Sequence, residues 1–231
     1  MSMDQRTHFH AELQNLEQAI HEIGDRAYAL IGKSVRALVD GDVDLASEVK
    51  AGDEVIDQMY LDVHNKWINL MARQQPMGQD LRLMSVLLHL NVTLERTGDQ
   101  TVNIARFAEF TQRLPRSDRV VEQIIEMGDL VGPMLLTAIE SFVRRDADEA
   151  RLLPAMDEPV DRINRNMYRE VVASGPDPGL LEWATHMMMA ARALERVGDQ
   201  AVDIGEQVVF LVTGEFTEWN EEAIQDRALE S

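Results

Sequence analysis

The chain has 231 residues, of which 41 are acidic and 22 basic, so its formal net charge at pH 7 is −19. Phosphate contacts need clustered lysine and arginine, so this balance argues against an extended nucleic-acid or anionic-membrane footprint. Cations and basic protein surfaces are favoured as partners. Because the chain has no cysteine, it has no disulfides, thiolate nucleophiles or thiolate metal sites, which fits a reducing compartment.

The sequence predicts a protein that is neither exported nor inserted into a membrane. Residues 1–10 are polar and lack the apolar run of a signal peptide. No window contains about 18 consecutive apolar residues, the minimum for a spanning helix. We therefore expect a cytoplasmic protein that binds no nucleic acid.

The apolar pattern predicts an all-α fold. Apolar residues recur every three or four positions nearly throughout, and only 5% of residues are aromatic. Gly and Asp at residues 40–42, and Pro76 further on, are typical of helix ends. The helices expected in the first half run from about Asp4 to Val39, from about Asp44 to Arg73 and from about Gln79 to Thr111.

The second half repeats this plan. After a turn at residues 114–117, the expected helices run from about Asp118 to Arg145, from Asp148 to Ala173, and from the Gly/Pro-rich loop 174–179 to about Thr213. We expect residues 215–231 to form an acidic, mobile tail.

An internal duplication underlies this symmetry. The stretch 94–104, LERTGDQTVNI, recurs as LERVGDQAVDI at 194–204, and Asp53-Glu54-Val55-Ile56-Asp57 recurs as Asp157-Glu158-Pro159-Val160-Asp161. The second copy is a few residues shorter, and we expect the deletion in the loop near Pro76. The sequence therefore predicts six long helices in two tandem, pseudo-symmetric three-helix bundles, one repeat at 1–113 and one at 117–214.

The repeated segments carry stacked carboxylates. Residues four apart share a helix face, so Glu95 and Asp99 lie one above the other with Asn103 a turn beyond. This stripe points away from the apolar seam of the same helix. The matching sets are Asp53 with Asp57 on the preceding helix, and in the second half Asp157 with Asp161 and Glu195 with Asp199 and Asp203.

Converging carboxylates of this kind indicate a cation site. Like charges repel unless a cation lies among them, and oxygen ligands favour Mg²⁺, Mn²⁺, Ca²⁺ or iron over zinc. Gly98 and Gly198 each cost a helix interior about 1 kcal/mol relative to alanine. We therefore expect a neighbouring helix or a ligand to approach the backbone closely at both positions.

Other candidate residues carry less weight. His89 has Met189 as its counterpart, so a structural histidine is favoured over a ligand. We expect Met187, Met188 and Met189 to contribute to interior packing. Arg96 and Arg196 beside the acids could bind phosphate, although a role in offsetting local charge is favoured. We find no Glu-x-x-His pair of the di-iron kind and no credible nucleophile with its base.

The two segments resemble the repeated E(D)xxxD motif of the PhoU family, accessory proteins of the phosphate-specific transport system. The resemblance extends through Asp80-Leu81-Arg82 and the ending Val212-Thr213-Gly214-Glu215. It implies two three-helix bundles with surface sites for divalent or trivalent ions such as iron, Mn, Mg or Zn. The implied ligands are Asp53, Asp57, Glu95, Asp99 and Asn103 in one site, and Asp157, Asp161, Glu195, Asp199 and Asp203 in the other.

Two differences between the copies predict unequal sites. Asp203 stands where the first copy has Asn103, and Glu206 stands where it has Arg106. We therefore expect the second site to be the more acidic and to differ in metal affinity or metal number.

The resemblance also implies a regulatory role. When phosphate is plentiful, the family restrains the phosphate ABC transporter and keeps the phosphate-sensing histidine kinase from activating its response regulator. Implied partners are the ATPase subunit of that transporter and the kinase, at the inner membrane face, with a homodimer as the assembly. Two alternatives stay open from the residues: a metal-free acidic adaptor that docks basic partners, and a metal-dependent enzyme on a helical bundle, which the missing base and nucleophile disfavour.

Overall fold

The computed structural model describes residues 3–219, and every regular element in that range is helical. The helices are α1 (Met3–Asp40), α2 (Val43–Gln74), α3 (Gln79–Ala105), α4 (Phe107–Thr111), α5 (Asp118–Arg144), α6 (Ala147–Ala150), α7 (Leu153–Ala173) and α8 (Pro178–Thr213). The predicted all-α fold is confirmed. The predicted acidic tail lies mostly outside the described residues.

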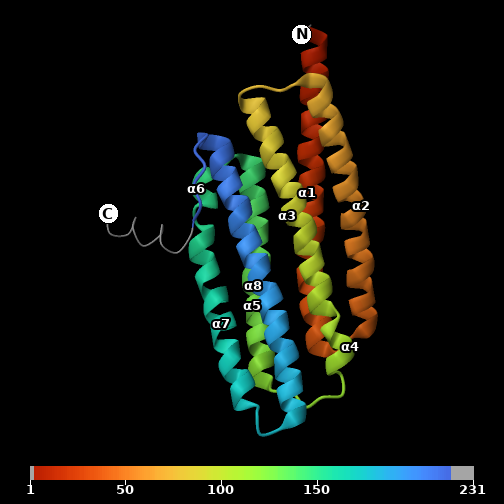
Figure 1. Ribbon diagram of the computed structural model, residues 1–231, viewed down its shortest axis with the longest axis vertical. Coiled ribbons are helices and arrows are strands. Elements are labelled where there is room, and N and C mark those ends of the chain that lie inside the picture. The colour runs from red at the N-terminus through yellow and green to blue at the C-terminus, as the bar shows by residue number, and fades with distance from the viewer. Residues whose placement is uncertain (1–2, 220–231) are drawn as a thin grey trace, which may run out of the picture.

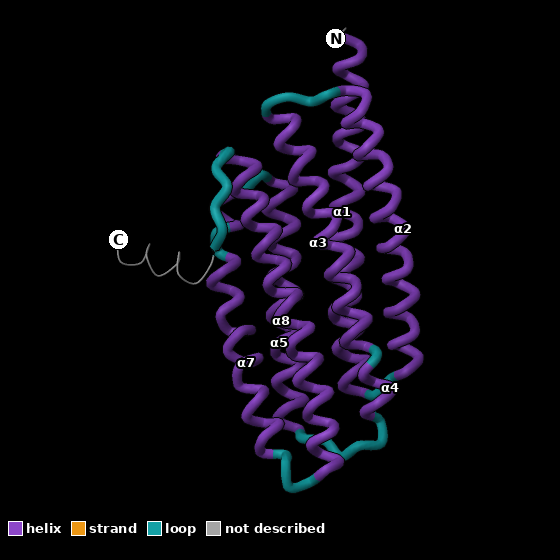
Figure 2. Tube along the Cα trace, in the orientation of Figure 1, coloured by secondary structure: helices purple, strands orange, loops and turns teal. Residues whose placement is uncertain are grey.

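The long helices form two bundles that lie side by side (Figure 1). Helices α1, α2 and α3 pack together, as do α5, α7 and α8, and the bundles meet where α1 contacts α5 and α3 contacts α8. In Figure 1, α3 and α8 run past each other in opposite directions. Figure 2 shows the connections gathered at or near the two ends of the molecule, so long uninterrupted helix faces lie between them.

Two predicted helices are divided. The third continues past a short irregularity at Arg106 as α4, and the fifth begins as α6 and restarts as α7. Pro154 lies in the first turn of α7. Proline lacks a backbone N–H and restricts the residue before it, so it suits the start of a helix and interrupts one that is already running.

The deletion in the second repeat lies in a helix, so its prediction in the loop near Pro76 was wrong. The connections 75–78 and 174–177 join the helices alike in both repeats. Helix α7 has 21 residues, whereas its counterpart α2 has 32. The short helix α6 makes up only four residues of this difference. The second bundle is therefore shortened at the end where α7 meets α8.

The main hydrophobic core includes residues of both bundles, and glycines let the central helices approach each other. A β-carbon on Gly24 of α1 would lie 2.8 Å from Ile139 Cδ1 of α5, and one on Gly128 of α5 would lie 2.9 Å from Val35 Cγ2 of α1. The duplicated glycines therefore allow α1 and α5 to pack closely where the two repeats meet. No helix of the described chain is both long and apolar enough to traverse a bilayer.

Candidate metal centre

The apolar seam and the register between helices position the acidic residues. Leu94 and Thr97 of the seam are fully buried, whereas Asp99 and Asp199 of the carboxylate stripe are exposed and Glu195 is only 6% exposed. The predicted outward-facing stripe is therefore confirmed only in part. Trp67 Nε1 of α2 donates to the Met84 carbonyl of α3 at 2.6 Å. Asn91 Nδ2 of α3 donates to the Tyr60 carbonyl of α2 at 3.1 Å. These bonds fix α2 beside α3 at the height of the acidic segment.

Gly98 provides the space into which the first buried carboxylate fits. A β-carbon at this position would lie 2.2 Å from Asp53 Oδ1, far inside contact distance. The Asp53 side chain reaches α3 from α2, and the residue is only 7% exposed. The predicted close approach to the glycine backbone is therefore confirmed, and the approaching group is a carboxylate from the neighbouring helix.

Asp53 belongs to a cluster with Asp57, Glu95 and Asp99, which we name the first acidic cluster. Burial and then the charges of Asp57, Asp99 and Glu95 raise the pKa of Asp53 from 3.8 to about 7. Burial and then Asp99 and Asp57 raise the pKa of Glu95. Asp53 Oδ1 is buried without a hydrogen-bond partner among the described residues. A buried oxygen without a partner destabilises the folded state unless a ligand interacts with it.

The second repeat reproduces this arrangement in Asp157, Asp161, Glu195 and Asp199, the second acidic cluster. A β-carbon on Gly198 would lie 2.4 Å from Asp157 Oδ1. Burial, followed by neighbouring carboxylates, raises the pKa of Asp157 and of Glu195 to about 7. Asp157 Oδ1 and Glu195 Oε2 are also buried without a hydrogen-bond partner in the part of the chain described.

Arginines distinguish the two clusters, a difference that the sequence analysis above did not predict. Arg192 donates to Glu195, and Arg165 donates to Asp161 at 3.4 Å. In the first repeat the matching residues are Val92 and Leu61. The second cluster thus has cationic partners of its own, and the first cluster has none at these positions. An alignment of the two repeats could have predicted this difference, because Arg192 and Arg165 stand where the first repeat has apolar residues.

Asn103 and Asp203 lie at the junction between the bundles. Asn103 lines a pocket with Arg196 of α8. Asp203 faces α3: burial raises its pKa, while His89 and Arg96 of α3 lower it. The structure thus brings together four acids in each cluster. It places Asn103 of α3 near α8 and Asp203 of α8 near α3. Their assignment as metal ligands stays a prediction.

The donor atoms in each cluster suit a hard cation. All are carboxylate oxygens from two adjacent helices, and among residues 3–219 some of them, such as Asp53 Oδ1 and Asp157 Oδ1, are buried without a hydrogen-bond partner. Within residues 3–219, no three His, Asp or Glu side chains are arranged so that they could hold a metal ion as they stand. Closure around an ion therefore requires side-chain rotation, which mutual repulsion opposes and a cation would favour.

The family model described as the PhoU domain matches this chain twice, at residues 20–108 and 124–208. The chain belongs to the PhoU family. Among its PhoU relatives, the phosphate-specific transport system accessory protein PhoU homolog of Pseudomonas putida is 33% identical over 207 residues, 89% of this chain and 81% of the relative. The homolog of Rhizobium meliloti (strain 1021) is 30% identical over 209 residues, 89% of this chain and 87% of the relative.

Solved PhoU structures share the whole architecture. The crystal structure of PhoU from Pseudomonas aeruginosa has a TM-score of 0.85 and 33% identity, over 90% of this chain and 100% of that one. The phosphate transport system regulatory protein PhoU from Streptococcus pneumoniae has a TM-score of 0.82 and 26% identity, over 91% of this chain and 100% of that one. The family consists of accessory and regulatory proteins of phosphate transport, and the chain is not an enzyme.

Proposed function

We propose that this chain restrains phosphate uptake and phosphate-starvation signalling when phosphate is plentiful. Its partners in this proposal are the ATPase subunit of the phosphate ABC transporter and the phosphate-sensing histidine kinase. The chain would act in the cytoplasm, at the inner membrane face through these proteins, as a homodimer. Support comes from relatives named as accessory proteins of phosphate-specific transport, which match 89% of the chain.

The second part of the proposal is that each acidic cluster binds metal between two helices. The observation that carries it is the pair of carboxylates seated on glycines, Asp53 on Gly98 and Asp157 on Gly198, each with a buried Oδ1 that lacks a hydrogen-bond partner among the described residues. Carboxylate oxygens favour iron, Mn²⁺ or Mg²⁺ over zinc. A bound cation would coordinate these oxygens and would relieve the repulsion among the four carboxylates of each cluster.

Metal content tests the second part directly. Protein purified without chelator is compared by elemental analysis with the variant Glu95→Ala/Asp99→Ala/Glu195→Ala/Asp199→Ala. We expect metal in the natural chain and little in the variant. Equal metal in the two proteins, with both folded by circular dichroism, would contradict binding at the clusters.

Deletion of the gene tests the regulatory part. We expect a phosphatase reporter of phosphate starvation to be expressed in phosphate-rich medium once the chain is absent, and to be repressed again when it is restored. Unchanged reporter expression would count against the role.

A metal-free adaptor is the second candidate, favoured by the absence of a preformed metal site within residues 3–219. In that case the clusters would attract basic surfaces of a partner through charge alone. Binding would then weaken steeply with salt and would not respond to chelator. A chelator-sensitive interaction favours the metal-binding reading instead.

A further inference from the structure

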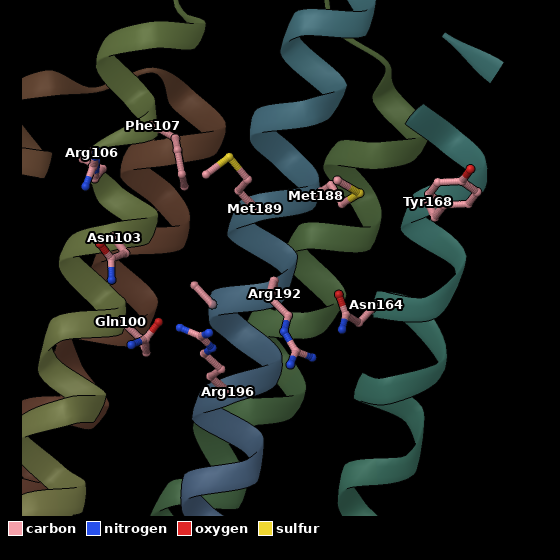
Figure 3. A pocket seen from close by; sticks show the side chains of 11 residues that line it. Gln100, Asn103, Arg106, Phe107, Asn164, Tyr168, Met188, Met189, Arg192 and Arg196 are labelled. Atoms are coloured by element: carbon pink, nitrogen blue, oxygen red, sulfur yellow. The ribbon is translucent and has the colours of Figure 1, made fainter. Parts of the chain in front are cut away.

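A pocket of about 520 Å³ opens where α3, α7 and α8 meet (Figure 3). Figure 3 shows Arg196 reaching from α8 toward Gln100 on α3, while Arg192 reaches toward Asn164 on α7. The polar residues that line the pocket are Gln100, Asn103, Arg106, Asn164, Arg192 and Arg196. Three arginines and three amide side chains thus gather at one place in a chain whose net charge is −19.

Two of these arginines are available to a ligand. Within residues 3–219, neither the Arg106 nor the Arg196 side chain forms a hydrogen bond or an ion pair, and both residues are exposed. The Arg106 guanidinium lies 5.9 Å from the centroid of the Phe107 ring. Arg192 binds Glu195, yet its side chain stays 56% exposed, with donors left over.

The duplication shows that the fold does not require this charge. At the matching end of the α3–α8 junction, the first-repeat residues Asn103 and Arg106 are replaced by Asp203 and Glu206. The counterpart of Arg192 is Val92. Arg196 is duplicated as Arg96, so Arg106 and Arg192 are the two cations that this end of the pseudo-symmetric junction has and the other end lacks.

We infer that this pocket binds the phosphate group of a small phosphate-bearing molecule. Guanidinium forks make charge-assisted hydrogen bonds to phosphate oxygens, and amide N–H groups complete a tetrahedral set of donors. The remaining walls are apolar, formed by Phe107, Met188, Met189 and Tyr168. They leave room for the organic part of a phosphate monoester, whereas orthophosphate alone would occupy a small part of the volume. This site stands apart from the proposed regulation and from the metal clusters.

Titration calorimetry on the full chain tests the site. Orthophosphate, AMP and adenosine are titrated at low ionic strength with chelator present, so that metal held by the acidic clusters cannot bind the phosphate. We expect AMP to bind and adenosine not to bind. Binding of orthophosphate as tight as that of AMP would identify the free anion as the source of the phosphate group. We expect Arg106→Glu, which installs the residue of the other repeat, to weaken binding by about tenfold or more, because it removes a charged hydrogen bond.

Arg26→Glu on α1 is the matched control, because it changes the charge equally at an exposed position outside the pocket. It should bind as the natural chain does. If Arg106→Glu loses its helical circular dichroism, Arg196→Gln provides the readout, with weakened binding again expected. The inference is overturned if neither orthophosphate nor AMP binds at millimolar concentrations, if adenosine binds as well as AMP, or if the folded arginine variants bind normally.

Discussion

Gly98 and Gly198 show how one residue type can serve a carboxylate on a different helix. Each lies inside a long helix, where alanine would be more stable by about 1 kcal/mol. Each also leaves the space that the carboxyl of Asp53 or Asp157 fills. The helix thus loses intrinsic stability so that an acidic group can be buried against its backbone, and that burial raises the pKa of both aspartates to about 7.

Replacing Gly98 with alanine should therefore separate helix stability from metal binding. The added methyl would displace Asp53, so we expect the variant to keep its helices but to lose the metal of the first cluster. Elemental analysis under metal-replete conditions measures this. Gly32→Ala is the control, because a β-carbon there meets nothing within 4 Å. Equal metal in both variants would mean that Asp53 is not a ligand.

The stability of the metal-free protein should fall as pH rises. Asp53, Asp157 and Glu195 have folded-state pKa values of about 7, well above those of an unfolded chain. The folded state thus binds more protons between about pH 4 and 7, and the stability present below pH 4 is lost as pH rises through 7. In chelator, Tm should be lower at pH 8 than at pH 5 by at least roughly 2–4 °C, the effect of about 1 kcal/mol.

Asp53→Asn/Asp157→Asn should flatten that slope, because an amide carries no charge at either pH. Thermal melts followed by circular dichroism at both pH values provide the comparison. A slope as steep as that of the natural chain would show that other groups control the pH dependence.

At the scale of the elements, the duplicated helices are alike in their seams and at the crossing of α1 and α5, and they differ around the acidic clusters. Gly24 and Gly128 recur because α1 and α5 cross closely between the bundles. Arg192 and Arg165 occur in the second repeat alone and accompany its acids. Asp203 and Glu206 predict that the second site is the more acidic, and these two arginines offset part of its charge.

Gly24→Val tests the crossing of α1 and α5. The larger side chain would overlap Ile139, whose Cδ1 lies 2.8 Å from the position of an added β-carbon. We expect a loss of about 1–3 kcal/mol in the free energy of unfolding, typical of overpacked cores. Urea unfolding measures it, with Gly32→Val as the exposed-side control. A loss no larger than that of the control would indicate that the two bundles yield easily at this crossing.

At the scale of the whole molecule, one hydrophobic core includes residues of both repeats. Helices α3 and α8 also bond directly, since Thr97 Oγ1 donates to Gln200 Oε1 at 2.9 Å. Near the end of α8, Arg82 Nη1 of α3 donates to the Leu211 carbonyl at 3.2 Å. The repeats are therefore joined along their length.

Unfolding should accordingly be a single transition. Leu94→Ala and Leu194→Ala each remove a fully buried side chain from one repeat, at an expected loss of about 2–5 kcal/mol. We expect each variant to lower the one Tm seen by calorimetry, with the calorimetric and van't Hoff enthalpies in agreement. Two separated transitions in either variant would show that the repeats unfold independently.

The sequence by itself determined the helices, the duplication and the four acids of each cluster, because helical periodicity and residue spacing are local properties of the chain. It also predicted that something approaches Gly98 and Gly198. Only the tertiary structure decided that Asp53 and Asp157 fill those spaces, that Asn103 and Asp203 lie at the junction of the bundles, and that Arg106 after α3 shares a pocket with two arginines of α8. These outcomes depend on how helices far apart in sequence rotate and pack against one another, and no local pattern encodes that geometry.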